Sequence, residues 1–292
     1  MSGTFRTVSA DGTSLRGWSG AGDGPPVLLC NGLGAVPAAW PRLVAADSGY
    51  DVTTWYHRGT FGSDRPQDER RVRVEDHVED AVAVLDARGI ERAVVVCWSV
   101  GVNVGFELSR RHPDRVAGVL AVAGVPGGTF ATMGGPLRVP RRLRHPLATG
   151  TARTAAVAGP ALTWLLPRLP VDRRTTWLLT HSGFMLPGAD PQVLAPMLRE
   201  FVRQDWQWYF RLALAASRHP AMDLSELHCP VAFVAGRHDV LTGVDDIVAA
   251  AAAIPGAQVT VLPGSHFLSL EHPELVHAAL DALAARTDLA RA

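Results

Sequence analysis

The run from Val94 to Gly105 contains the feature that most constrains this fold. It reads Val-Val-Val-Cys-Trp-Ser-Val-Gly-Val-Asn-Val-Gly, so an apolar, β-branched stretch ends at Trp98 and is followed by Ser99 and Gly101. Such a stretch predicts a buried strand. A sharp turn from that strand into a helix would lift the Ser99 hydroxyl above the sheet, where it could act as a nucleophile. The alternative is that Ser99 only caps the helix that follows.

Apolar runs and helical segments alternate along the rest of the chain. Apolar runs at 26–30, 52–56, 94–98, 116–123, 231–235 and 258–262 predict strands, and residues 5–8 and 15–18 around Asp11-Gly12 predict a β-hairpin. Residues 37–46, 72–88 and 273–285, together with the segment after Ser99, predict helices. Strands that alternate with helices imply βαβ units, so the expected class is α/β with a mostly parallel sheet.

Residues 127–219 interrupt this alternation. They contain many prolines, several helical segments and a concentration of large aromatic residues, but no clear strand. We expect a helical cap that covers the carboxyl ends of the strands, where ligands of α/β sheets bind. The core would then consist of residues 1–126 and 220–292. The apolar and aromatic character of the cap favours an apolar substrate group, and we expect the side chains that contact it to be Trp98, Met133, Phe184 and Trp208. The alternative is that these side chains only form the core of the cap itself.

Charge and composition exclude several classes of function. The 292 residues carry 28 basic and 28 acidic side chains, and this zero net charge argues against binding driven by charge alone to nucleic acid or to an anionic membrane. Every basic side chain is arginine. The absence of lysine excludes Schiff-base chemistry, pyridoxal attachment and a phosphate-binding P-loop. We expect no cofactor, and the oligomeric state stays open.

The cysteines and the apolar stretches bear on the compartment. Cys30, Cys97 and Cys229 lie far apart without metal-type spacing, so we expect reduced thiols, no metal site and a cytoplasmic protein. The first residues lack the pattern of a signal peptide. The longest apolar stretch, residues 155–166, is too short to span a membrane.

An acid and a base follow Ser99 in the chain. Asp239 comes just after the run 231–235, and His266 lies in a glycine-bearing loop after the run 258–262. A carboxylate that orients a histidine, which in turn deprotonates a serine, is the arrangement of nucleophilic acyl transfer. Asp245 and Asp246 are rivals for the acid, but they are predicted to lie in the first turn of a helix, where acids are stabilising.

The order Ser99, Asp239, His266 and the turn around Ser99 resemble the α/β-hydrolase superfamily, specifically its capped esterase, lactonase and haloperoxidase-like group. The resemblance implies a mostly parallel eight-stranded sheet flanked by helices, with a helical cap insertion. It also implies an oxyanion hole made by the backbone N–H groups of Leu33 and Val100.

Three positions depart from the pattern of that superfamily. The oxyanion turn of this chain would be residues 31–34, Asn-Gly-Leu-Gly, and Asn31 replaces the histidine that usually opens it. Cys97 stands where glycine is usual, and we expect its side chain to pack away from Ser99. Tyr56 replaces an acid two residues before Arg58, an arginine that we expect to tie loops together.

We therefore expect a cofactor-independent serine hydrolase. It would cleave a carboxylic ester, lactone or thioester through an acyl-enzyme, on a small apolar substrate. Acyl transfer, carbon–carbon bond hydrolysis and perhydrolysis by the same triad stay open, as does a non-catalytic ligand receptor. Halide displacement and epoxide opening are disfavoured, because relatives with those activities have aspartate at the position of Ser99.

Overall fold

The computed structural model describes residues 3–225 and 227–291. Within these ranges eight strands form one sheet in the order β1-β2-β4-β3-β5-β6-β7-β8. The strands are β1 (Gly3–Val8), β2 (Ser14–Ser19), β3 (Pro26–Cys30), β4 (Asp51–Trp55), β5 (Ala93–Trp98), β6 (Val116–Val122), β7 (Val231–Gly236) and β8 (Gln258–Leu262). β1 and β2 form the predicted hairpin, β2 pairs with β4 antiparallel, and every other pair is parallel. The prediction of a mostly parallel, eight-stranded sheet is confirmed.

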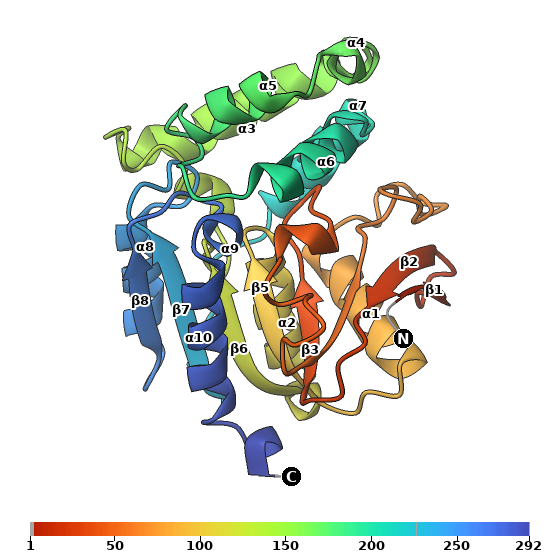
Figure 1. Cartoon of the computed structure of the whole chain (residues 1–292), viewed down its shortest axis with the longest axis vertical. Helices are drawn as coiled ribbons and strands as arrows, with labels where there is room; N and C mark the ends of the chain where they lie inside the picture. The colour runs from red at the N-terminus through yellow and green to blue at the C-terminus, as the bar shows by residue number, and fades with distance from the viewer. Residues whose placement is uncertain (1–2, 226, 292) are drawn as a thin grey trace.

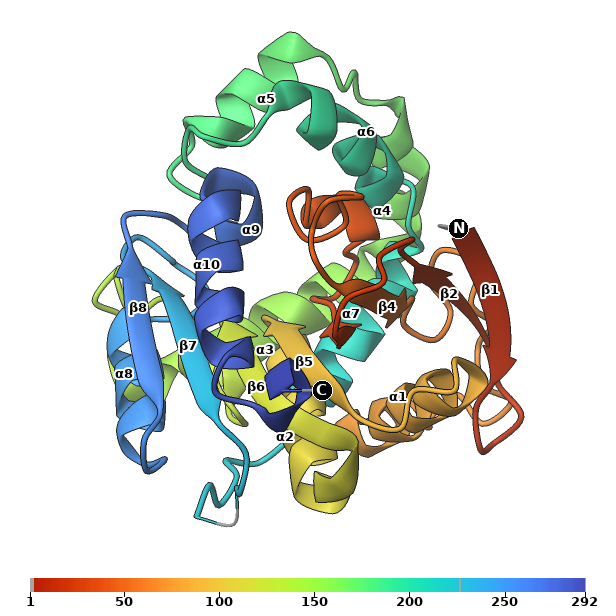
Figure 2. The ribbon, with the colours of Figure 1, turned by 60° about the horizontal axis from the view of Figure 1, so that its bottom comes forward.

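Helices cover both faces of the sheet (Figures 1 and 2). Successive residues of β5 point to opposite faces: Val95 and Cys97 pack with α1, α2 and α8, whereas Val94 and Val96 pack with α10. A parallel strand buried on both faces reads as a continuous apolar run, which is why the sequence shows it so clearly. The helices of these layers are α1 (Val74–Ala87), α2 (Gly101–Arg111), α8 (Val244–Ala252), the short α9 (Leu268–Glu271) and α10 (Pro273–Ala284). Short 3-10 turns are η1 (Pro37–Ala39), η2 (Pro113–Arg115), η3 (Thr129–Ala131), η4 (Leu166–Arg168) and η5 (Asp288–Arg291).

The predicted helix over residues 37–46 is wrong. The structure has only the 3-10 turn η1 there, followed by a series of turns. Pro41 explains the difference, because a helix that began at Pro37 would need the N–H of residue 41 to reach the Pro37 carbonyl, and proline has no N–H.

Between β6 and β7 the described chain contains helices and no strand. These helices are α3 (Arg141–Val157), α4 (Gly159–Leu165), α5 (Arg173–Thr180), α6 (Pro191–Val202) and α7 (Trp206–Ala216). They lie above one end of the sheet (Figure 1). We refer to residues 127–219 as the cap segment. Across the described ranges, no helix combines the length and the apolar character needed to cross a bilayer.

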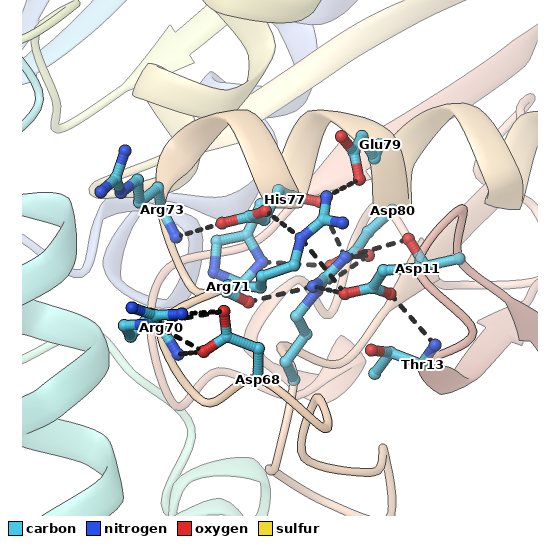
Figure 3. Close-up of polar contacts among 12 residues, drawn as sticks. Asp11, Thr13, Asp68, Arg70, Arg71, Arg73, His77, Glu79 and Asp80 are labelled. Carbon is cyan, nitrogen blue, oxygen red and sulfur yellow. Dashed lines mark hydrogen bonds and ion pairs between the residues drawn. The ribbon is translucent and has the colours of Figure 1, made fainter.

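Arg58, in the loop after β4, is fully buried and joins this loop to the β1–β2 hairpin, to the segment before α1 and to α1 itself. Its guanidinium donates to Asp80 of α1 at 2.7–3.1 Å, to Asp11 of the β1–β2 hairpin at 2.6 Å, to the Ser9 hydroxyl and to the Arg71 carbonyl. Figure 3 shows Asp11, His77 and Asp80 gathered at the start of α1. Arg58 therefore ties loops together as expected.

Asp80 stays charged in spite of its burial. Burial alone would raise the pKa of its carboxyl, but hydrogen bonds from His77 and Arg58 and the charge of Arg58 outweigh that effect and lower the pKa. A buried charge is tolerated when it is paired in this way, and removal of one partner leaves the other uncompensated.

We predict that Asp80→Asn destabilises the fold strongly. Because the buried guanidinium of Arg58 would lose its main counter-charge, the free energy of unfolding in urea should fall by about 3–5 kcal/mol. Asp68→Asn, which removes an exposed partner of Arg70, is the matched control and should change it little. Equal losses in the two variants would contradict the proposed role of the buried pair.

His57 should make the fold sensitive to acid. Burial, with a smaller contribution from His77, lowers the pKa of His57 from 6.5 to about 3. Below pH 6.5 the unfolded chain therefore binds a proton that the folded chain does not, so this contribution to stability is lost as the pH falls from 6.5 towards 3. The expected slope is about 1.4 kcal/mol per pH unit. Urea unfolding of wild type and of His57→Leu between pH 7.5 and 4.5 measures how the free energy of unfolding depends on pH. Equal slopes in the two proteins would refute this role of His57.

Candidate active site

Ser99 lies at the turn between β5 and α2, with its backbone in the left-handed region at φ +54°. The turn is held by the Ser99 N–H, which donates to the Val122 carbonyl of β6 at 3.1 Å. It is also tight, because a Cβ atom at Gly101 would lie only 2.0 Å from the Cys30 carbonyl oxygen. Glycine at 101 is therefore required for α2 to start against the end of β3.

Cys97 points away from Ser99 and into the core. It is completely buried, and a Cβ atom at Gly105 would lie 2.0 Å from its sulfur, so Gly105 provides the space that the larger residue at 97 needs. Burial, with a hydrogen bond to Cys30, raises the pKa of the Cys97 thiol well above its usual value. The thiol stays protonated and packed, which makes it unsuitable as a nucleophile.

The structure brings Ser99, His266 and Asp239 together. His266 Nε2 lies 2.9 Å from Ser99 Oγ, and His266 Nδ1 lies 2.8 Å from Asp239 Oδ2. Asp239 is fully buried, and its other oxygen accepts the backbone N–H groups of Leu241 and Thr242, both at 2.8 Å. These two bonds fix the carboxylate on the loop after β7, so it can orient the imidazole.

The rival residues are placed elsewhere. Asp245 and Asp246 lie in the first turn of α8, as the sequence predicts. Asp246 forms ion pairs with Arg141 and Arg144 at the start of α3, so its carboxylate joins the cap segment to α8. It is therefore engaged in a contact that does not involve His266.

Two backbone N–H groups are available near Ser99. Leu33 follows β3, whose end is paired with that of β5, and a Cβ atom at the neighbouring Gly32 would lie 3.4 Å from Ser99 Cβ. Val100 precedes the first turn of α2. Within the described chain, neither the Leu33 nor the Val100 N–H has a hydrogen-bond acceptor. Unpaired donors beside a nucleophile can stabilise a developing oxyanion.

Asn31, which replaces the usual histidine, has a structural contact. Its buried side-chain oxygen accepts the indole N–H of Trp40 at 2.8 Å. This bond ties the start of the oxyanion turn to the segment after η1, so the asparagine shapes the turn by packing and hydrogen bonding.

The four predicted substrate contacts fall in different places. Trp98 donates its indole N–H to the His266 carbonyl at 2.9 Å, and the Phe184 ring lies 5.3 Å from that of Phe267, the residue after the base. Trp208 instead donates to the Arg58 carbonyl at 2.7 Å, and Met133 is half-buried in the turn before α3. The structure thus brings Trp98 and Phe184 to the loop after β8 that carries His266, which we call the base loop, whereas Trp208 anchors α7 to the core.

Sequence reasoning missed the side chains that approach the oxyanion turn from the cap segment. A Cβ atom at Gly34 would lie 2.7 Å from atoms of Phe201 and Gln204 and 3.0 Å from the Tyr209 ring. Burial raises the pKa of Tyr209 to about 12, so its hydroxyl stays protonated. The aromatic run 201–210 was the available signal, but which of its rings faces the turn depends on the orientation of α7.

Glu271 was also missed, although it supports the base loop. Its buried carboxylate accepts the Ser265 N–H at 2.7 Å, the Ser265 hydroxyl at 2.6 Å, and the Leu186 N–H of the cap segment at 2.7 Å. One side chain therefore connects the residue before His266 to the cap segment. An acid five residues after the base, in the same short loop and helix, was the only signal in the sequence.

We predict that Glu271→Gln lowers kcat about 10–100-fold on an ester substrate and changes KM little. The amide has only one acceptor oxygen, so a buried N–H would face its NH₂ group, and the resulting shift would displace His266. Glu274→Gln, at an exposed glutamate of α10, is the control. A variant that loses thermal stability but keeps its kcat would show that Glu271 only stabilises the fold.

Comparison with known proteins gives consistent matches. The family model described as alpha/beta hydrolase fold matches residues 25–273. A RutD protein of Caulobacter segnis, provisionally named a carbamate hydrolase, is 38% identical over 122 residues, which are 41% of this chain and 45% of that protein, so the match spans less than half of the relative's length. RutD of Caulobacter sp. strain K31, with the same provisional name, is 27% identical over 263 residues, 89% of this chain and 90% of that one. The enol-lactonase from Burkholderia xenovorans LB400 superimposes with a TM-score of 0.72 at 22% identity, over 96% of this chain and 99% of the other.

Proposed function

The chain belongs to the alpha/beta hydrolase fold family, and on that premise we propose that it is a serine hydrolase that cleaves a carboxylic ester, lactone or thioester carrying an apolar group. One observation carries the proposal: a continuous hydrogen-bonded chain runs from Ser99 Oγ through His266 to the buried carboxylate of Asp239. In this proposal Ser99 is the nucleophile, His266 the general base and Asp239 the residue that orients it.

The first half of the reaction forms an acyl-enzyme. His266 Nε2 takes the proton from Ser99 Oγ as the oxygen attacks the carbonyl carbon of the substrate. The negative charge that develops on the carbonyl oxygen is stabilised by the N–H groups of Leu33 and Val100. The tetrahedral intermediate then collapses, and His266 returns the proton to the leaving oxygen or sulfur.

The second half of the reaction releases the acid. His266 deprotonates a water molecule, the hydroxide attacks the acyl carbon, and Ser99 leaves with the proton that the imidazole gives back. Throughout, Asp239 accepts the His266 Nδ1–H and stabilises the imidazolium that forms in each half. No cofactor is needed for either half.

Serine as the nucleophile selects among the reactions of this fold. Attack on an epoxide or a haloalkane would leave an alkyl ether on Ser99, and water cannot hydrolyse an ether as it hydrolyses an acyl group. Attack on an ester, thioester, lactone or carbamate leaves an acyl or carbamoyl group that water can remove. Carbamate cleavage is the second candidate, because the RutD match over 90% of its length carries that name.

The apolar character of the substrate follows from the surroundings of His266. The rings of Trp98 and Phe267 lie 5.8 Å from the imidazole, and Phe184 of the cap segment packs on Phe267. We propose that residues 127–219 form a cap whose aromatic side chains contact the acyl or alkyl group. Acyl transfer, carbon–carbon cleavage and perhydrolysis would use the same triad, and product analysis with water, alcohols and peroxide as acceptors would separate them from hydrolysis.

We predict that a fluorophosphonate labels Ser99 and that Ser99→Ala abolishes labelling. On short and medium-chain p-nitrophenyl esters, Ser99→Ala should lower kcat by about 10⁴-fold or more, and Asp239→Asn by about 10⁴-fold. Ser14→Ala, in the hairpin far along the chain from the site, should keep full activity. A folded Ser99→Ala variant that still hydrolyses these esters, or a wild type that takes no label, would refute the proposal.

A further inference from the structure

A cavity of about 910 Å³ opens between the core and the cap segment. Its walls come from the segment 65–75 that leads into α1, from the end of α3, from α7 and from residues 218–220. Ser99, Asp239 and His266 are not among its lining residues. We refer to this cavity as the arginine groove. Its lining includes Arg65, Arg70, Arg73, Arg211 and Arg218, and the apolar residues Val157, Leu214 and Ala215. Its volume lies in the range of small-molecule sites.

Arginine dominates the polar lining. Among the described residues of the groove there are five arginines and only two glutamates. Three of the arginines have acidic partners: Arg65 pairs with Asp205, Arg70 with Asp68 and Arg211 with Glu69. The second glutamate, Glu75, faces His219 Nδ1 at 3.6 Å and Arg111 at 3.9 Å.

Arg73 and Arg218 remain without an acidic partner. In the described chain no carboxylate lies within ion-pair distance of either guanidinium. Both residues are exposed, and they approach the groove from two different parts of the protein: Arg73 precedes α1, and Arg218 follows α7. Two unpaired guanidiniums that line one cavity attract an anion with several acceptor oxygens.

The rest of the lining is apolar. Ala156 and Val157 at the end of α3, with Leu214 and Ala215 of α7, face the same cavity, and the Val157 side chain is 83% exposed. The Trp208 ring also lines the groove, with the Arg65 guanidinium 4.4 Å from its centre. An exposed valine beside half-buried leucine and alanine offers a surface for a hydrocarbon group.

From this arrangement we propose that the arginine groove binds an amphipathic anion, with a phosphate or carboxylate head between Arg73 and Arg218 and a hydrocarbon segment against Val157, Leu214 and Ala215. A purely inorganic anion would leave the apolar wall exposed to water, and a neutral amphiphile would leave both guanidiniums unpaired. The ligand would contact the core and the cap segment at once. The site is separate from Ser99, so it does not depend on the proposed hydrolysis.

Titration calorimetry on Ser99→Ala protein tests the site. The probes are octyl phosphate and octanoate, with octyl glucoside as the neutral analogue and inorganic phosphate as the head group alone. We expect the two amphipathic anions to bind at least about tenfold more tightly than either control probe. Arg73→Gln/Arg218→Gln should weaken octyl phosphate at least about tenfold, and Val157→Ser should weaken it without affecting inorganic phosphate.

A matched variant separates the groove from the general charge of the surface. Arg142→Gln/Arg153→Gln removes two exposed arginines of α3 outside the groove, and its affinity for octyl phosphate should equal that of the parent. Equal losses in the two double variants, equal affinity for phosphate and octyl phosphate, or no binding of either amphipathic anion would overturn the proposal. If the groove double variant does not fold, Arg73→Gln and Arg218→Gln are measured singly, and each should weaken binding.

Discussion

The close contact between the end of β3 and the turn after β5 is the constraint on which the site depends. Gly101 can begin α2 only because it has no side chain to strike the Cys30 carbonyl, and this contact holds Ser99 in a left-handed conformation. Such a conformation costs about 1–2 kcal/mol for a residue with a side chain. The bond from Ser99 to β6 and the burial of β5 on both faces offset that cost. The strain persists because the central strands cannot move to relieve it.

The loops that carry Asp239 and His266 are held by carboxylates as well as by packing. Asp239 accepts two backbone N–H groups of its own loop while it contacts His266, and Glu271 accepts three donors around Ser265 and Leu186. The cap segment therefore contacts the site twice: the Leu186 N–H binds Glu271 beside the loop of His266, and side chains of residues 201–209 pack on Gly34.

Short-range features of this fold can be predicted from the sequence, whereas contacts between distant segments cannot. The predicted bounds of β3 and β5–β7 agree with the structure within about a residue or two, because each strand is an apolar run buried by its neighbours. The bounds of β8 agree as well, although this edge strand is mostly exposed. Residues 37–46 have an apolar pattern typical of a helix, but Pro41 has no N–H to donate and the helix does not form. Trp208 illustrates the long-range case. Its aromatic side chain suits a substrate pocket, but its indole N–H donates to the carbonyl of Arg58, which lies 150 positions earlier in the chain. No local pattern contains that pairing.

The sequence by itself determined the fold class and the positions of the turns that carry Ser99, Asp239 and His266. These follow from local properties: β-branched runs, glycines where no side chain fits, and residue types with the required chemistry. Only the tertiary structure decided that Trp208 binds the Arg58 carbonyl, that Glu271 joins the loop of His266 to the cap segment, and that Arg73 and Arg218 line one groove. Each of these depends on how distant segments pack, and side chains of the same type at neighbouring positions differ only in the direction that packing gives them.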